Sequence, residues 1–343
     1  MEQISMFTAI KREEKLSRLG DCLEKLNGVI DWESFRPALA EAMARSPRLK
    51  GGRRPYDDVL MFKILILQRI FNLSDDQTEY QINDRISFMR FLDISVHDTV
   101  PDAKTIWLYR ETLAKKGMAK KLFEQFNEML EAHGLITHTG SIVDASFVDM
   151  PKTGLKRAEM EIVKEGGLPE KLQGEEHKAA RSQFDADARF GKKYGETHYG
   201  YKDSVKVDVD SKLIVNYSIV AANVEDCKAF IELLDDKDRL LYGDKGYYGK
   251  SLEAQFPPNV KSMILDKALV NHPLTEEQKE SNRQKSKVRA RVEHVFGYMK
   301  KALHGMTIRS KSKTRARFGI SLLNLTYNLF RYAFLKRTQP TAG

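Results

Sequence analysis

The sequence of 343 residues predicts an α/β protein that carries an all-α region at its N-terminal end. Residues 1–134 consist of helical stretches joined by short loops. From Leu135 onward, short runs of β-branched residues alternate with helical stretches, which predicts a mixed sheet with helices in residues 135–335 and leaves 336–343 as a tail. Hydrophobic residues make up 41% and charged residues 31%, a balance that excludes a disordered chain, a collagen and a disulfide scaffold.

The predicted N-terminal helices are marked by their ends and by their apolar faces. Residues 10–26 form a charged amphipathic stretch, and Asp31 is placed to cap the next one. Ser74 and Asp102 are the predicted N-caps of two further helices. Residues 59–71 are almost wholly apolar but too short to span a membrane, so they predict a buried core helix. No membrane span is expected in the sequence.

The predicted sheet draws its strands from several short segments. Residues 135–148 predict one or two strands, and residues 199–221 alternate like a hairpin with Asp210 at its turn. The remaining predicted elements are short strands at 239–242 and 261–265 and helices at 225–234, 287–303 and 318–334. The polar, charge-dense residues 151–198 predict an insertion or long surface loop that is ordered only in part.

The cysteines and the N-terminal segment bear on the compartment. Cys22 and Cys227 lie far apart, and two lone thiols indicate a reducing environment and exclude a cysteine-based zinc site. The first twenty residues lack the apolar run of a signal peptide. A cytoplasmic protein is therefore expected.

The positive charge is concentrated in one segment. Residues 283–317 hold twelve basic residues and a single acid, Glu293, so the formal charge of this segment is +11. The formal net charge of the whole chain is +9, so the remaining residues sum to −2. A mildly acidic body with one strongly basic segment indicates a polyanionic partner, most often nucleic acid. The alternative is a solvated basic surface without a partner.

Three acids occupy positions where a negative charge is unexpected, either in an apolar strand or in a basic segment. Asp144 follows Ile142 and Val143 within a predicted strand, and Asp244 ends a second apolar strand directly before Lys245 and Gly246. Acids at strand ends beside glycine lie where α/β sheets place ligands. Glu293, the third, is kept inside the basic segment.

The helix around Glu293 can be tested by its geometry. With Arg289 at zero, Glu293 falls at about 40° and Lys300 at about 20°, so the three side chains share one narrow face. Four apolar residues form the buried stripe beside that face: Val288, Val292, Val295 and Met299. A carboxylate at the edge of the buried stripe can point into a cleft. The simpler alternative is an i,i+4 ion pair between Arg289 and Glu293 on a solvated surface.

Three acids from different elements suit one kind of chemistry. Cleavage and transesterification of phosphodiesters need an activated oxygen nucleophile and a neutralised leaving oxygen, and two divalent cations supply both. Carboxylate oxygens are the ligands that Mg²⁺ prefers. The surrounding lysines and arginines would neutralise a DNA backbone.

The chain resembles a known family, the DDE-type transposases of bacterial insertion sequences. Within this family it resembles the group named after insertion sequence five. The N-terminal region is similar to that family's helical region through the segments GGRRPYDDVLMFKILILQRIFNLSDDQTEY and VPDAKTIWLYRETL. Three further blocks resemble those that hold the catalytic acids: GSIVDASFVD, YGDKGYYG and VRARVEHVFGYMKK. Within the last block, Arg289, Glu293 and Lys300 match an R-x3-E-x6-K signature.

The resemblance implies an RNase H-like catalytic core of residues 135–335 and a helical DNA-binding or dimerisation domain of residues 1–134. It implies that Asp144, Asp244 and Glu293 bind two Mg²⁺ ions, with Mn²⁺ as a substitute. The expected activity is cleavage of the element's ends and their joining to target DNA by a free 3′-hydroxyl. The expected partners are double-stranded DNA, in the form of terminal inverted repeats and target DNA, and further copies in a homodimer or larger synaptic assembly. A bacterial, nucleoid-associated location follows.

Six basic residues are expected to contact DNA: Arg289, Lys300, Arg291, Lys301, Arg53 and Arg54. Arg53 and Arg54 either bind phosphates or lie at the tip of a loop without a partner. The sequence departs from the family pattern three residues before Arg289, where Ser286 stands in place of a frequent Tyr.

Two other functions stay open from the sequence: a catalytically silent DNA-binding repressor, and a metal-dependent nuclease without strand transfer. Several other residues are assigned ordinary roles. Solvated positions are predicted for Asp149, Asp185 and Asp187, and core positions for Phe71 and Trp107. His294 is predicted to point away from Glu293, at about 140° on the same helix. Near Lys202, three aromatic side chains either meet DNA or begin a strand: His198, Tyr199 and Tyr201.

Overall fold

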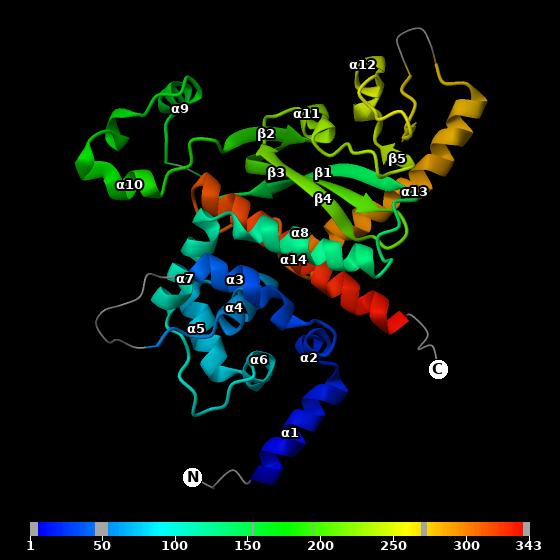
Figure 1. Ribbon diagram of the computed structural model, residues 1–343. Helices are drawn as coiled ribbons and strands as arrows, with labels where there is room; N and C mark the ends of the chain where they lie inside the picture. The colour runs from blue at the N-terminus through cyan, green and yellow to red at the C-terminus, as the bar shows by residue number, and fades with distance from the viewer. Residues whose placement is uncertain (1–5, 45–53, 153, 194, 269–272, 339–343) are drawn as a thin grey trace.

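The structure, a computed structural model, describes residues 6–44, 54–152, 154–193, 195–268 and 273–338. Helices form its N-terminal part, and a mixed sheet with helices on its faces forms the remainder (Figure 1). The N-terminal elements are α1 (Met6–Leu19), α2 (Cys22–Asn27), the 3-10 turn η1 (Trp32–Phe35), α3 (Arg36–Met43), α4 (Asp58–Phe71), α5 (Asp75–Asp84), α6 (Ile86–Leu92), α7 (Ala103–Lys115) and α8 (Met118–Ala132).

The caps that the sequence predicts for these helices are present. The Ser74 side chain accepts from the Gln77 N–H, and the Gln77 side chain accepts from the Ser74 N–H, which together cap α5. The Asp102 carboxylate accepts from the Thr105 N–H at the start of α7. As predicted, α4 is buried along nearly its whole length.

The remaining elements build the sheet and its helices. The strands are β1 (Ser141–Asp149), β2 (Arg189–Lys193), β3 (Glu196–Asp208), β4 (Ile214–Ala221), β5 (Leu240–Gly243) and β6 (Lys261–Ile264). The helices are α9 (Arg157–Lys164), α10 (Lys178–Ser182), α11 (Asp226–Ile231), α12 (Lys250–Glu253), α13 (Glu276–Lys301) and α14 (Lys313–Thr338), with 3-10 turns η2 (Glu170–Leu172), η3 (Glu175–His177) and η4 (Lys245–Tyr247).

Strand β1 lies at the centre of the sheet. It pairs antiparallel with β3 on one side and parallel with β5 on the other, and β6 extends the sheet beyond β5. Strand β2 pairs with the beginning of β3, and β4 pairs with the remainder of β3. The turn of the β3–β4 hairpin holds Asp210, as predicted.

Helix α14 joins the two halves of the molecule. It runs alongside α8 and also packs on α4 and α7, so it lies between the sheet and the N-terminal helices (Figure 1). One hydrophobic core cluster contains Phe62 from α4, Val205 from β3 and Leu325 from α14. The domain division at residue 134 stays a prediction, because the packed core continues across it.

The prediction of a loop is wrong for residues 189–193 and 196–198, which belong to the sheet, and an insertion over the preceding residues stays a prediction. The segment 151–198 contains α9 and α10, and its strand β2 pairs with β3 as part of the sheet. Asp185 is buried rather than solvated, because it accepts hydrogen bonds from the Tyr201 hydroxyl at 2.9 Å and from the Ala188 N–H at 3.0 Å. A partner sixteen residues away gives this carboxylate a buried position that its own segment does not indicate.

The predicted core position of Trp107 is also wrong. This residue is 40% exposed, whereas Ile106, Tyr109 and Leu113 of the same helix are buried. Phe71 is half-buried and packs against Phe88. Within the described residues, no helix is long and apolar enough to cross a membrane.

Candidate active site

Two of the predicted acids are brought together by neighbouring parallel strands. Ser141 pairs with Leu241 and Ile142 with Tyr242. Continued along the two strands, this register sets Asp144 level with Asp244. The Asp244 carboxylate follows the last residue of β5 and accepts from the Lys245 N–H at 2.8 Å, where the chain turns into η4.

Glu293 reaches the same place from α13, which packs on β1 and β5. The predicted apolar stripe is confirmed: Val292, Val295 and Met299 are buried, and Val288 packs against the core. Glu293 lies beside this stripe with its side chain 60% exposed. His294 points elsewhere, as predicted, and its Nδ1 is 3.1 Å from the Lys212 Nζ.

The three acids line one cavity of about 700 Å³, which we term the acid cavity. Its wall also includes the cations Lys193, Lys202 and Arg289 and the aromatic side chains Tyr247 and Phe296. A cavity in which carboxylates face cations suits a ligand that carries both a metal ion and a phosphate.

Arg289 connects two of the acids. Its Nη1 donates to Asp144 Oδ2 at 3.2 Å and its Nη2 donates to Glu293 Oε1 at 3.0 Å. An i,i+4 surface pair with Glu293 is therefore not the whole role of Arg289, because the same guanidinium also binds Asp144, which lies 145 residues away in the sequence. The Arg289 Nε is buried without a hydrogen-bond partner among the described residues.

The electrostatic position of Asp144 reflects its surroundings. Burial raises the pKa of its carboxyl, and the negative charge of Asp244 raises it further. The Ala145 N–H, which donates to Oδ1 at 2.8 Å, and the charges of Arg289 and Lys193 act in the opposite direction. The carboxylate form of Asp144 thus depends on cations nearby, and a bound metal ion would stabilise it in the same way.

Comparison with known families shows to which family the chain belongs. A family model described as "Transposase DDE domain" matches residues 136–329, and one described as "Transposase domain (DUF772)" matches residues 11–112. The chain belongs to the DDE transposase family. It is a DNA transposase, its mixed sheet with flanking helices is an RNase H-like core as predicted, and the family implies dependence on divalent metal ions.

One solved structure is also similar to the transposase. It is described as "Cryo-EM structure of piggyBac transposase synaptic complex with hairpin DNA (SNHP)". The similarity covers 94% of this chain and 76% of that one, with 10% sequence identity and a TM-score of 0.45.

The chemistry of the donors fits a divalent metal ion, but their present arrangement is incomplete. Asp144, Asp244 and Glu293 offer hard carboxylate oxygens, the ligand type that Mg²⁺ and Mn²⁺ favour. Among the described residues, however, no three acidic, histidine or cysteine side chains are grouped closely enough to hold an ion. Arg289 occupies one oxygen of Asp144 and one of Glu293.

The other basic residues predicted to contact DNA lie outside the acid cavity. Lys300 and Lys301 are exposed in the last turn of α13, and Arg54 is exposed shortly before α4. Arg291 donates to the Val209 carbonyl at 2.7 Å. Arg53 lies outside the described residues.

The sequence did not single out Asp226 and Lys193 in the cavity wall, and it gave Lys202 no role of its own. Lys202 Nζ donates to Asp226 Oδ1 at 2.7 Å and to the Val224 carbonyl at 2.7 Å. Lys193 ends β2, Lys202 lies on β3 and Asp226 begins α11, so only the fold brings them beside Asp144. No spacing within one element could have indicated them.

Proposed function

We propose that Asp144, Asp244 and Glu293 are the catalytic acids of the transposase and together bind two Mg²⁺ ions, with Mn²⁺ as a substitute. One observation carries the proposal: three acids from β1, the end of β5 and α13 line the same cavity. The metal pair, when bound, supplies activation of the attacking oxygen and neutralises the leaving oxygen of a phosphodiester. The proposal includes membership of the group named after insertion sequence five.

The residues of the chain have distinct parts in this scheme. Asp144 and Glu293 each give one oxygen to Arg289, and an ion that took these two oxygens would displace the Arg289 guanidinium from them. The guanidinium is then available to a phosphate oxygen at the cavity. Lys202 is held in place by Asp226 and adds positive charge to the same wall.

The proposed substrate is double-stranded DNA that carries the terminal inverted repeats of the element. The transposase cuts the ends, and the free 3′-hydroxyl attacks target DNA, within a homodimer or a larger synaptic assembly. The basic segment supports this substrate, since Lys300 and Lys301 are exposed in the last turn of α13, the helix that carries Glu293. Arg291, Arg53 and Arg54 are proposed as further backbone contacts.

A strand-transfer assay distinguishes the proposed reaction from its two alternatives. Purified transposase is incubated with pre-cleaved element ends and a target plasmid, with Mg²⁺, with Mn²⁺ or with EDTA. We expect joined products with either metal and none with EDTA, because the 3′-hydroxyl needs the metal ions for its attack.

Uncut ends are tested in parallel. Metal-dependent cutting without any joining would indicate a nuclease, and salt-sensitive binding with neither cutting nor joining would indicate a repressor. Either result would contradict the proposal.

A further inference from the structure

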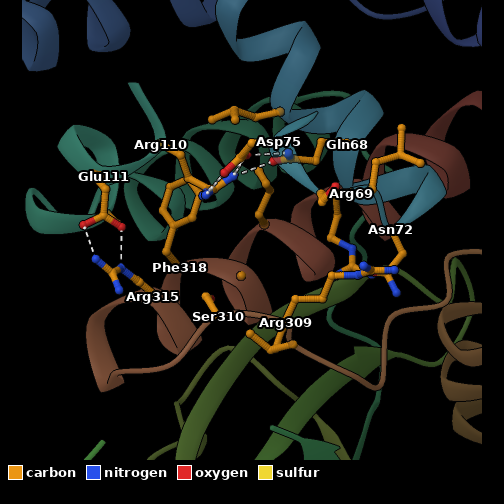
Figure 2. Close-up of a pocket in the computed structure, with 17 residues that line it drawn as sticks. Gln68, Arg69, Asn72, Asp75, Arg110, Glu111, Arg309, Ser310, Arg315 and Phe318 are labelled. Carbon is orange, nitrogen blue, oxygen red and sulfur yellow. Dashed lines mark hydrogen bonds and ion pairs between the residues drawn. The ribbon is translucent and has the colours of Figure 1, made fainter. Parts of the chain in front are cut away.

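A second cavity lies between the N-terminal helices and the segment that leads into α14 (Figure 2). We term it the arginine pocket; its volume is about 260 Å³. Its walls come from α4, α5 and α7 on one side and from residues 308–322 on the other. Apolar side chains such as Leu65, Ile308 and Phe318 form part of the lining.

Four arginines line this pocket, and two of them are neutralised. The Arg110 guanidinium forms a two-pronged ion pair with Asp75, in which Nη2 is 2.8 Å from Oδ2. Arg315 forms a similar pair with Glu111, at 2.5 and 3.1 Å. The other two, Arg69 and Arg309, have no acidic partner among the described residues (Figure 2).

Arg69 is an unusual residue to leave without an anion. It is only 8% exposed, and its Nη2 donates to the carbonyls of Leu303 and His304, both at 3.1 Å, while its Nε is buried without a partner. Burial lowers the pKa of Arg69 to about 10, and the like charge of Arg309 contributes. The heads of the two side chains meet at one end of the pocket (Figure 2).

Two adjacent guanidinium groups with a spare buried donor are a strong recognition unit for a tetrahedral oxyanion. We propose that the arginine pocket binds a phosphate group between Arg69 and Arg309, and that this phosphate belongs to the DNA backbone. The apolar lining suits the deoxyribose next to such a phosphate. The net charge of the lining, positive by two after the paired residues cancel, matches a polyanion.

The position of the pocket relative to Asp144 supports a DNA phosphate. The last residue of β1, Asp149, is bonded through its backbone to Met306 and Ile308, and Ile308 lines the pocket. Asp144 and Asp149 are five residues apart on one strand, a span of roughly 17 Å at about 3.4 Å per residue. That span corresponds to about five base-pair steps of a duplex. A duplex that passes Asp144 and extends somewhat beyond this span therefore has the length to reach the pocket wall at Ile308.

The inference rests on DNA being the substrate and not on the identity of the catalytic acids. Its test measures binding without metal ions, so its failure is separate from a failure of the proposed active site. Arg309→Gln is the main variant, because Arg309 is exposed and forms no hydrogen bond or ion pair among the described residues. Arg69 is left unchanged, because it also holds the end of α13. Lys104→Gln removes the same charge from an exposed position on α7 outside the pocket.

The first arm measures thermal unfolding in sodium phosphate and in sodium chloride of equal ionic strength. We expect phosphate to raise the Tm of the wild type and of Lys104→Gln by more than that of Arg309→Gln, which keeps only the general stabilisation by a kosmotropic anion. Arg309→Glu places a carboxylate beside Arg69, so we expect a higher Tm than the wild type in chloride and no phosphate response beyond that of Arg309→Gln.

The second arm measures binding of a terminal DNA duplex in EDTA at several salt concentrations. We expect Arg309→Gln to weaken binding by about five- to tenfold and to reduce the salt slope by about one, with a smaller loss for Lys104→Gln. A phosphate response in the first arm without a specific loss of DNA binding would overturn DNA as the source. If Arg309→Gln matched Lys104→Gln in both arms, the phosphate site itself would be refuted.

Discussion

Replacing Asp144 by Asn is expected to lower metal-dependent cleavage of a DNA end by about a thousandfold or more. Several kcal/mol of transition-state stabilisation come from the metal ions, and each 1.4 kcal/mol corresponds to about a factor of ten in rate. A neutral amide oxygen is a far weaker ligand for Mg²⁺ than the carboxylate that β1 presents to the cavity. Cleavage is followed with a labelled DNA end in Mg²⁺ and in Mn²⁺, and Glu293→Gln is expected to lose activity in the same way.

The matched control for Glu293→Gln is Glu280→Gln, since both acids are on α13 and Glu280 is exposed away from the cavity. This control should cleave at the wild-type rate. DNA binding in EDTA should be retained by Asp144→Asn, because the substitution frees Arg289 from an acidic partner. Wild-type cleavage by both Asp144→Asn and Glu293→Gln would remove these residues from the active site.

Replacing Lys206 by Met is expected to lower the free energy of unfolding by about 3 to 5 kcal/mol. Lys206 lies on β3 with 0% exposure, and its Nζ donates to Asp238 at 2.9 Å and also to Asp235. Asp238 is itself only 1% exposed and accepts from the Ser141 hydroxyl. Without Lys206 this buried carboxylate loses its ammonium partner, and among the described residues only the His138 ring, with Nδ1 at 3.6 Å from Oδ1, stays beside it as an ion-pairing partner. Removing one partner of a buried ion pair in this way is strongly destabilising.

Denaturation in urea measures this loss, with the slope m compared between variants. Lys237→Met is the control, because Lys237 forms an exposed pair with Glu131 and should change stability by no more than about 0.5 kcal/mol. Adding Asp238→Asn to Lys206→Met should recover part of the loss. Equal stability of Lys206→Met and Lys237→Met would mean that the buried pair contributes nothing.

Local patterns in the sequence predict much of this structure. The α/β class, the buried helix α4 and the caps at Ser74 and Asp102 follow from spacing that neighbouring residues determine. The position of Glu293 beside an apolar stripe follows from helical periodicity in the same way. Such features can be predicted because residues within the same helix or strand determine them.

Features that depend on distant partners were not predictable. Asp185 is buried because Tyr201 reaches it, and Lys206 is tolerated in the core because Asp238 arrives from another segment. Trp107 shows the limit of composition, since a large aromatic residue on a helix that packs into the core can still be 40% exposed. The arginine pocket joins residues more than two hundred positions apart, so no motif marks it.

The central claim is that Asp144, Asp244 and Glu293 hold metal ions together, and cleavage of the protein by bound Fe²⁺ tests it most directly. Fe²⁺ replaces Mg²⁺ at carboxylate sites and, with ascorbate and peroxide, generates radicals that cut the nearby backbone. We predict cuts close to residues 144, 244 and 293, suppressed by excess Mg²⁺ and lost in Asp144→Asn. Cutting that avoids these three places, or that persists unchanged in Asp144→Asn, would contradict a shared metal site.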